Sequence, residues 1–172
     1  MLTKVEIRPV IGSNVELNTV DGSGNHLYPL HEFNIVTNID QGQDAKKMAA
    51  PGQWPRFHYA DAMTITAEGQ ILGVGASDAA RATDYITKRL ALLDAILPSV
   101  ASPGLLTARH HGTLRVRFDG MTEDADAEVV CVQQAVPMQA LFPANSSFLI
   151  IWKGFLPYFT GVTTPTNRYQ LG

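Results

Sequence analysis

The residues of this sequence that could do chemistry are few and poorly spaced for it. His110 and His111 are adjacent, and adjacent strand residues point to opposite faces, so the two rings cannot hold one metal ion without a local break. No His-x-x-x-His or Cys-x-x-Cys spacing accompanies them. A metal site would require His26, His31 or His58 to converge on the pair, so the sequence favours loop or solvent-exposed histidines.

A nucleotide site and a nucleophile are equally poorly supported. The segment 73–75, Gly-Val-Gly, lies between a predicted strand and a predicted helix, where a dinucleotide-binding glycine motif would lie. Its third glycine position is occupied by Asp78, whose carboxylate would compete with a pyrophosphate for the helix amides. The single cysteine, Cys131, has apolar neighbours and resembles a buried structural thiol. The sequence therefore predicts no catalytic, cofactor or metal site.

Two groups of charged residues have simple structural interpretations. Arg115 and Arg117 share one face of a predicted strand and Arg109 precedes them, which would suit a phosphate or an acidic partner. The alternative, which we favour, is the outer face of a half-exposed strand. An acidic group lacks the spacing and central glycine of a calcium loop, so it is interpreted as solvated charge. It comprises Glu123, Asp124, Asp126 and Glu128.

The first third of the chain has the pattern of a β-meander. Residues Leu2–Val10 and Val15–Val20 alternate between apolar and polar, as half-buried strands do. The turn formers of Asp21–Asn25 then lead to a third apolar segment, Leu27–Thr37. The residues of Asn38–Pro55 have no period, which predicts a long loop.

A hairpin and one helix are expected next. Met63–Ala67 alternates, Glu68 and Gly69 form a predicted turn, and Gln70–Val74 would return as the second strand. Ser77 or Asp78 can cap a helix over 78–97, and Pro98 ends it. The apolar stripe is spaced by three or four residues, which predicts that it faces the core. Its main members are Ile86, Leu90, Leu93 and Leu97.

The remaining elements complete a mainly β (α+β) fold. Strands are expected at Gly112–Phe118, Ala127–Gln134 and Ser147–Lys153. We therefore predict an antiparallel β-sandwich with one flanking helix over residues 1–153. The residues 154–172 contain prolines and aromatics without a period, which predicts an extended C-terminal arm.

The composition excludes several classes of protein. The 172 residues are 45% hydrophobic and 17% charged, which fits one globular domain with a normal core. A net charge of -3 argues against a surface that grips nucleic acid phosphates. No apolar stretch approaches the roughly 18 residues that span a bilayer. A soluble protein made in a cytoplasm, without a membrane partner, is expected.

The order of these elements resembles a known family. The segments Met63–Val74, Asp78–Leu97, Gly112–Gly120 and Phe148–Phe159 carry a likeness to the N-terminal belt domain of distal tail proteins from long-tailed bacteriophages, which is related to tail tube proteins. The resemblance implies a non-enzymatic virion protein made in the host bacterial cytoplasm. It implies a ring of six copies that contacts the tail tube, the tip or hub and the tape-measure protein. DNA would only pass through the lumen, and no cofactor is implied.

A ring needs complementary patches on two sides of each subunit, and aromatic residues on irregular segments could supply them. The candidates are Trp54, Phe57, Phe155, Tyr158 and Phe159. If these residues instead fold back on their own domain, they are core residues.

Three alternatives remain open. A tail tube subunit would use a related sandwich with a long hairpin, and the short turn at Glu68 and Gly69 favours the distal tail role over it. A small glycan-binding sandwich would use Trp54 or Trp152 as a stacking platform. An enzyme would require His58, His110 and Asp119 to converge, among others, and their spacing does not suggest this.

Overall fold

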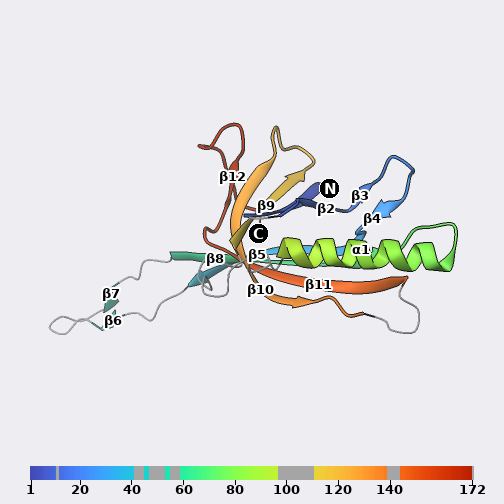
Figure 1. Cartoon of the computed structure of the whole chain (residues 1–172). Helices are drawn as coiled ribbons and strands as arrows, with labels where there is room; N and C mark the ends of the chain where they lie inside the picture. The colour runs from blue at the N-terminus through green and yellow to red at the C-terminus, as the bar shows by residue number, and fades with distance from the viewer. Residues whose placement is uncertain are drawn as a thin grey trace.

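The structure is a computed structural model that describes residues 1–10, 12–40, 45–46, 53–54, 59–96, 111–138 and 144–171, with the side chains at 38–40, 45–46, 53–54, 59–61 and 111 left out of the description. One helix and thirteen strands occur in this part of the chain (Figure 1). Their bounds are β1 Leu2–Pro9, β2 Val15–Leu17, β3 Thr19–Val20, β4 His26–Leu27, β5 Leu30–Asp40, β6 Ala45–Lys46, β7 Gln53–Trp54, β8 Tyr59–Leu72, α1 Asp78–Ile96, β9 His111–Phe118, β10 Ala125–Ala135, β11 Asn145–Gly154, β12 Phe159–Gly161 and β13 Arg168–Tyr169.

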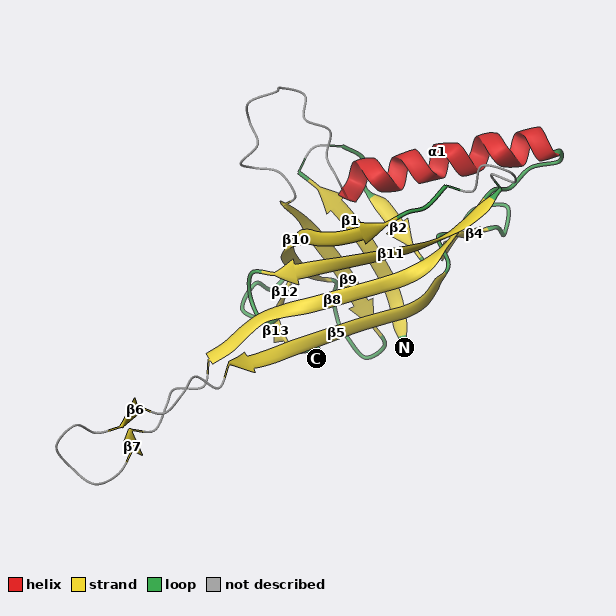
Figure 2. Ribbon diagram, turned by 90° about the horizontal axis from the view of Figure 1, so that it is seen from below, coloured by secondary structure: helices red, strands yellow, loops and turns green. Residues whose placement is uncertain are grey.

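A single bent sheet of nine strands forms both layers of the molecule. Its order is β2, β1, β9, β10, β11, β8 and β5, every pairing is antiparallel, and β12 and β13 attach beside the start of β10. The segment Ala125–Val130 of β10 pairs with β9, and Val129–Ala135 pairs with β11. Figure 2 shows β10, β11, β8 and β5 in front of β1, β2 and β9. The predicted mainly β sandwich with one helix is confirmed.

The core lies between these layers because the strands alternate, as their sequences predict. In β11, Phe148, Ile150 and Trp152 point inward, and they meet Met63 and Ile65 of β8. Core side chains of the other layer are Val5, Ile7, Leu114, Val116, Ala125 and Ala127. Trp152 is only 2% exposed, which rules out its use as a sugar-stacking platform.

The helix buries a different face from the one predicted. It begins where predicted, with the Ser77 hydroxyl accepting from the Ala80 N–H at 3.2 Å, and it packs beside β1, β2 and β8. The buried residues are Tyr85, Leu92, Ala95 and Ile96. Of the predicted core residues, Ile86 is 39% exposed, Leu90 is 52% exposed, Leu93 is partly buried and Leu97 lies outside the described residues.

Tyr85 explains this rotation. Its ring is fully buried and its hydroxyl lies 2.9 Å from Ser146 Oγ and 3.2 Å from the Pro137 carbonyl oxygen. A tyrosine combines a large apolar ring with a polar group that needs a partner when buried. Burying Tyr85 turns the next residue, Ile86, by about 100° toward solvent.

The turn predicted at Glu68 and Gly69 is wrong. Strand β8 runs without a break from Tyr59 to Leu72, between β5 and β11. A side chain at Gly69 would lie 2.4 Å from the Pro29 carbonyl oxygen and 2.7 Å from Phe148 Cζ, so the glycine permits close approach and does not mark a turn. Because β8 has no turn here, the sequence no longer favours the distal tail role over a tube subunit.

The strands β5 and β8 form a long hairpin whose far end extends past the other strands (Figure 2). Their pairing runs from Leu30 opposite Gly69 to Asp40 opposite Tyr59. The loop expected at 38–55 lies mostly outside the described residues. The strand predicted at Val15–Val20 is two strands in the structure, β2 and β3, which are separated at Asn18, where φ is 59°.

The C-terminal segment differs from the expected extended arm. Strand β12 pairs with β10, β13 pairs with β12, and the Phe159 ring is fully buried. The Glu123 carboxylate accepts hydrogen bonds from the N–H groups of Thr163 and Thr164 at 2.6 and 2.9 Å and from Asn167 Nδ2 at 2.8 Å. These contacts fix the turn between β12 and β13 to the turn between β9 and β10.

Candidate functional site

The histidines do not assemble a metal site in the described part of the chain. Within these residues, no group of three or more His, Cys, Asp or Glu side chains is placed to hold a metal ion. His26 on β4 and His31 on β5 are exposed. His58, His110 and Arg109 lie outside the described residues.

The candidate nucleophile, Cys131, is partly buried, and the candidate acid, Asp119, forms an ion pair. Burial raises the pKa of the Cys131 thiol to about 11, and the hydrogen bond to the Gln133 carbonyl oxygen offsets this only in part. The thiol is therefore protonated at neutral pH and a poor nucleophile. The Asp119 carboxylate lies 3.0 Å from the amino group of Met1.

The glycines before the helix serve packing. A side chain at Gly73 would lie 2.2 Å from the Arg81 carbonyl oxygen, and one at Gly75 would lie 2.7 Å from the Ala80 methyl group. The close approach of this turn to the first turn of α1 therefore accounts for both glycines without a phosphate.

An open cleft of about 530 Å³ lies between the β3–β4 turn, the end of β8 and the start of α1. Its strongest donors are already engaged. Asn25 donates to Asp21 at 3.0 Å, and Arg81 Nε donates to the Gly75 carbonyl oxygen at 3.1 Å. The cleft therefore carries no ligand assignment.

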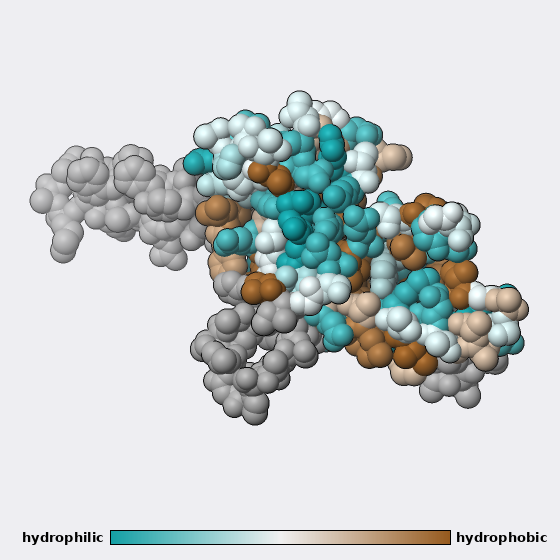
Figure 3. Space-filling model, turned by 45° about the horizontal axis from the view of Figure 1, so that its top comes forward, coloured by the Kyte–Doolittle hydropathy of each residue, from teal (hydrophilic) through white to brown (hydrophobic). Residues whose placement is uncertain are grey.

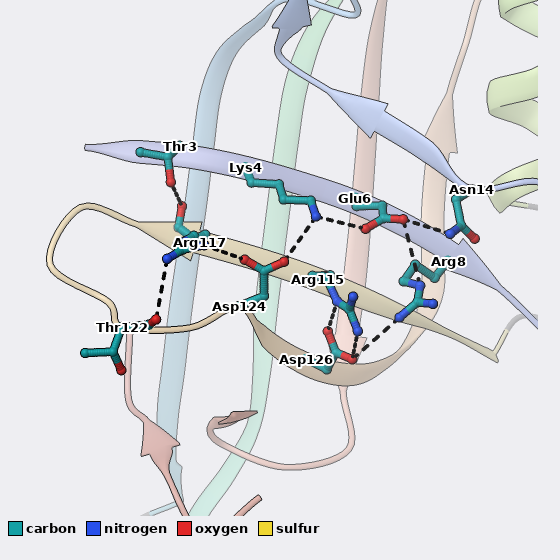
Figure 4. A network of polar contacts seen from close by, with 10 residues as sticks. All are labelled: Thr3, Lys4, Glu6, Arg8, Asn14, Arg115, Arg117, Thr122, Asp124 and Asp126. Carbon is teal, nitrogen blue, oxygen red and sulfur yellow. Dashed lines mark hydrogen bonds and ion pairs between the residues drawn. The ribbon is translucent and has the colours of Figure 1, made fainter. Parts of the chain in front are cut away.

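Charged side chains cover the outer face of β1, β9 and the start of β10 as a connected set of ion pairs (Figure 4). Arg115 contacts both oxygens of Asp126, at 2.7 and 2.9 Å, and this hydrogen bonding raises the pKa of the guanidinium. Lys4 and Arg117 contact Asp124 at 3.1 and 3.4 Å. Hydrophilic residues gather over this layer in Figure 3. Arg115 and Arg117 thus lie on the outer face of a half-exposed strand, as favoured from the sequence, and neighbouring carboxylates neutralise both.

The outer face of the other layer has a different character. Residues directly opposite one another in an antiparallel sheet share a face. Thr66 lies between Asn34 and Ile151, and Thr64 lies next to Val36. Charged side chains described on this face are confined to Glu32, Glu68 and Lys153. The described part of this face therefore carries mainly uncharged polar and aliphatic residues.

This layer is open on both sides within the described residues. Strand β5 ends the sheet, and β10 has no described strand on the side away from β11 beyond Val130. Each of these edge strands contains one buried side-chain oxygen without a hydrogen-bond partner among the described residues, Thr37 Oγ1 in β5 and Gln134 Oε1 in β10. A buried polar atom without a partner costs free energy. Sequence reasoning missed both residues, because neither type nor spacing distinguishes them.

The aromatic candidates for a subunit interface that the structure describes differ in burial. Phe159 belongs to the core of its own chain, which was the alternative interpretation of this residue. Phe155 is 48% exposed and Tyr158 is half-buried. The side chain of Trp54 and the whole of Phe57 lie outside the description. An interface role for the four residues other than Phe159 stays a prediction.

The sequence matches no protein-family model and no curated protein. Among solved structures, the chain is similar to chains in two structures of the phage P2 baseplate in its activated conformation, one with Ca and one with Sr. Each match has 9% sequence identity and a TM-score of 0.36, and covers 88% of this chain and 43% of the other. This chain therefore spans less than half the length of those proteins. A likeness this weak carries no argument about function.

In the described part of the chain, no helix is long and apolar enough to cross a membrane.

Proposed function

We propose that the chain is a structural protein of a phage tail, which forms a homo-oligomeric ring at the distal end of the tail and joins the tube to the tip or baseplate. DNA would pass through the ring, and the tape-measure protein would contact it. The observation that supports this role is the layer of β10, β11, β8 and β5, which is open on both sides in the described chain. Copies that join head to tail through two different edges can close into a ring.

A tail tube subunit is the second candidate. The long β5–β8 hairpin supports it, because the sequence-based argument against a tube rested on a turn that β8 does not contain. A distal ring and a tube differ in whether rings stack on one another, which is a property of assembly and can be measured directly.

The test is the mass and shape of the purified protein over a range of concentrations, by native mass spectrometry and negative-stain imaging. Closed rings near six copies support the distal tail role, and stacked tubes support the tube role. A compact monomer at every concentration, also after mixing with tail tube and tip proteins, contradicts both.

A further inference from the structure

We propose that two copies of this chain pair face to face through the outer face of β10, β11, β8 and β5, with Lys153 of each copy forming an ion pair with Glu68 of the other. The partner is a second copy of this chain. The ring proposed above joins copies through two edges of the sheet, so this pairing through a face goes beyond the proposed function and needs no ring.

The three charged side chains described on this face have no opposite charge beside them. Glu32 and Glu68 are directly opposite one another on β5 and β8, and both are exposed. Like charges in this arrangement repel each other. Among the described residues, neither carboxylate forms an ion pair, and neither does Lys153. The other outer face differs, because its charges are joined in ion pairs (Figure 4).

Lys153 is too far from the two carboxylates to pair with them inside one copy. It is opposite Thr64, whereas Glu68 is four residues further along β8. At about 3.4 Å per residue, this separation is roughly 14 Å along the strand. The positive charge and the two negative charges therefore lie at separate ends of the face. A second copy turned by 180° presents the opposite charge to each end.

A two-fold axis brings these charges together. Ile151 is opposite Thr66, and this pair lies midway between Lys153 and Glu68. Consider an axis between the two copies that crosses this midpoint at right angles to the line from Lys153 to Glu68. Rotation about it places each lysine over Glu68 of the other copy, as a self-complementary contact requires. Glu32, which is next to Glu68 on β5, then lies near the same lysine.

The same axis gives a crossing angle that packed sheets adopt. Neighbouring strands are about 4.8 Å apart, so the line from Lys153 to Glu68 is inclined by about 20° to the strands. Rotation about the axis doubles this inclination, so the strands of the two copies cross at about 40°. Sheets that pack face to face cross at about 30°. The pairing of charges and the packing of the two faces are therefore compatible.

The middle of the face is suited to this contact. Leu149 and Ile151 of β11 are half-buried there, and Val36 of β5 is 51% exposed. Val132, in the bulge of β10 beside this face, is 52% exposed. Pairing removes part of this aliphatic surface from water, which is favourable. The charges described on the face are the three that the contact brings together, so pairing leaves none of them without an opposite charge.

The test reverses the two charges in the variants Lys153→Glu and Glu68→Lys and measures particle mass by native mass spectrometry and sedimentation velocity at low salt. Either variant alone places like charges over one another at both ends of the contact. Its dissociation constant is therefore expected to rise at least about tenfold. An equimolar mixture of the two variants restores opposite charges at both ends, and so does the double variant. The mixture and the double variant are expected to associate as the wild type does.

The mixture separates a lost contact from a lost fold, because a misfolded variant is not rescued by the other variant. Asp94→Lys is the matched control, since Asp94 is exposed on α1 and not on this face, and it should leave association unchanged.

The outcomes separate this pairing from the proposed ring. Wild-type association that persists in both single variants, or that does not return on mixing, overturns the pairing. Rings that form equally well in all variants overturn the pairing and leave the proposed function standing. Pairs that return on mixing but never grow into rings, also with tail tube and tip proteins present, support the pairing and contradict the ring. Monomers under all these conditions contradict both.

Discussion

Gly69 of β8 lies directly opposite Phe148 of β11, with the Phe148 ring where a side chain at position 69 would be. An added Cβ would be 2.7 Å from Cζ of that ring and 2.4 Å from the Pro29 carbonyl oxygen. We expect Gly69→Ala to lower the free energy of unfolding by about 2 kcal/mol or more, because the backbone oxygen cannot move away easily. Chemical denaturation measures this.

Gly22 provides the matched control, since nothing lies within 4 Å of an added Cβ there. We expect Gly22→Ala to change the unfolding free energy by less than about 0.5 kcal/mol. Equal effects at the two positions would show that Gly69 is not closely packed.

The two faces of α1 give a second prediction. Leu92 is fully buried, so Leu92→Ala should lower the unfolding free energy by about 2 to 5 kcal/mol. Leu90 is two residues away and 52% exposed, so Leu90→Ala should cost less than about 1 kcal/mol in the monomer. Chemical denaturation of both variants measures the two losses of stability. A larger loss for Leu90→Ala than for Leu92→Ala would support the buried face predicted from the apolar stripe.

Glu123 predicts a pH dependence. Partial burial raises the pKa of its carboxyl, but the hydrogen bonds from Asn167, Thr164 and Thr163 outweigh this and hold the pKa below its ordinary value of 4.5. A carboxyl with a lowered pKa stabilises the fold above the unfolded value, and this contribution is lost as the pH falls through the folded value. Thermal unfolding should therefore show wild-type stability falling below about pH 4.5 more steeply than that of Glu123→Gln.

Glu16→Gln is the control for the loss of a carboxylate, because Glu16 is exposed on β2. This variant should keep the wild-type slope below pH 4.5. A slope that is the same in all three proteins would mean that Glu123 does not hold the turn between β12 and β13.

Cys131 predicts slow thiol chemistry. Its pKa of about 11, against an ordinary value of 9.0, leaves roughly a hundredfold less thiolate at pH 8 than an ordinary cysteine has. Iodoacetamide should label the folded protein about a hundredfold more slowly than the protein in denaturant. Equal labelling rates in the two states would show that the thiol is not shielded by β10 and its neighbours.

Local patterns in the sequence determined much of the fold. The period-two alternation of Leu2–Val10, Gly112–Phe118 and Ser147–Lys153 predicted strands that the structure contains, and Ser77 marked the start of the helix. These signals are reliable because alternation and capping depend on residues close together in the chain. The same local view found no spacing suited to catalysis.

Other features depend on residues far apart in the chain, and only the tertiary structure decided them. In the sequence, Gly69 suggests a turn, whereas in the structure the close approach of Pro29 and Phe148 is what requires a glycine there. The buried face of α1 follows from Tyr85 reaching Ser146, which is 61 residues away. Thr37 and Gln134 become noteworthy only when the sheet places them on its two open edges, because an edge is a property of strand order, and strand order is set by packing.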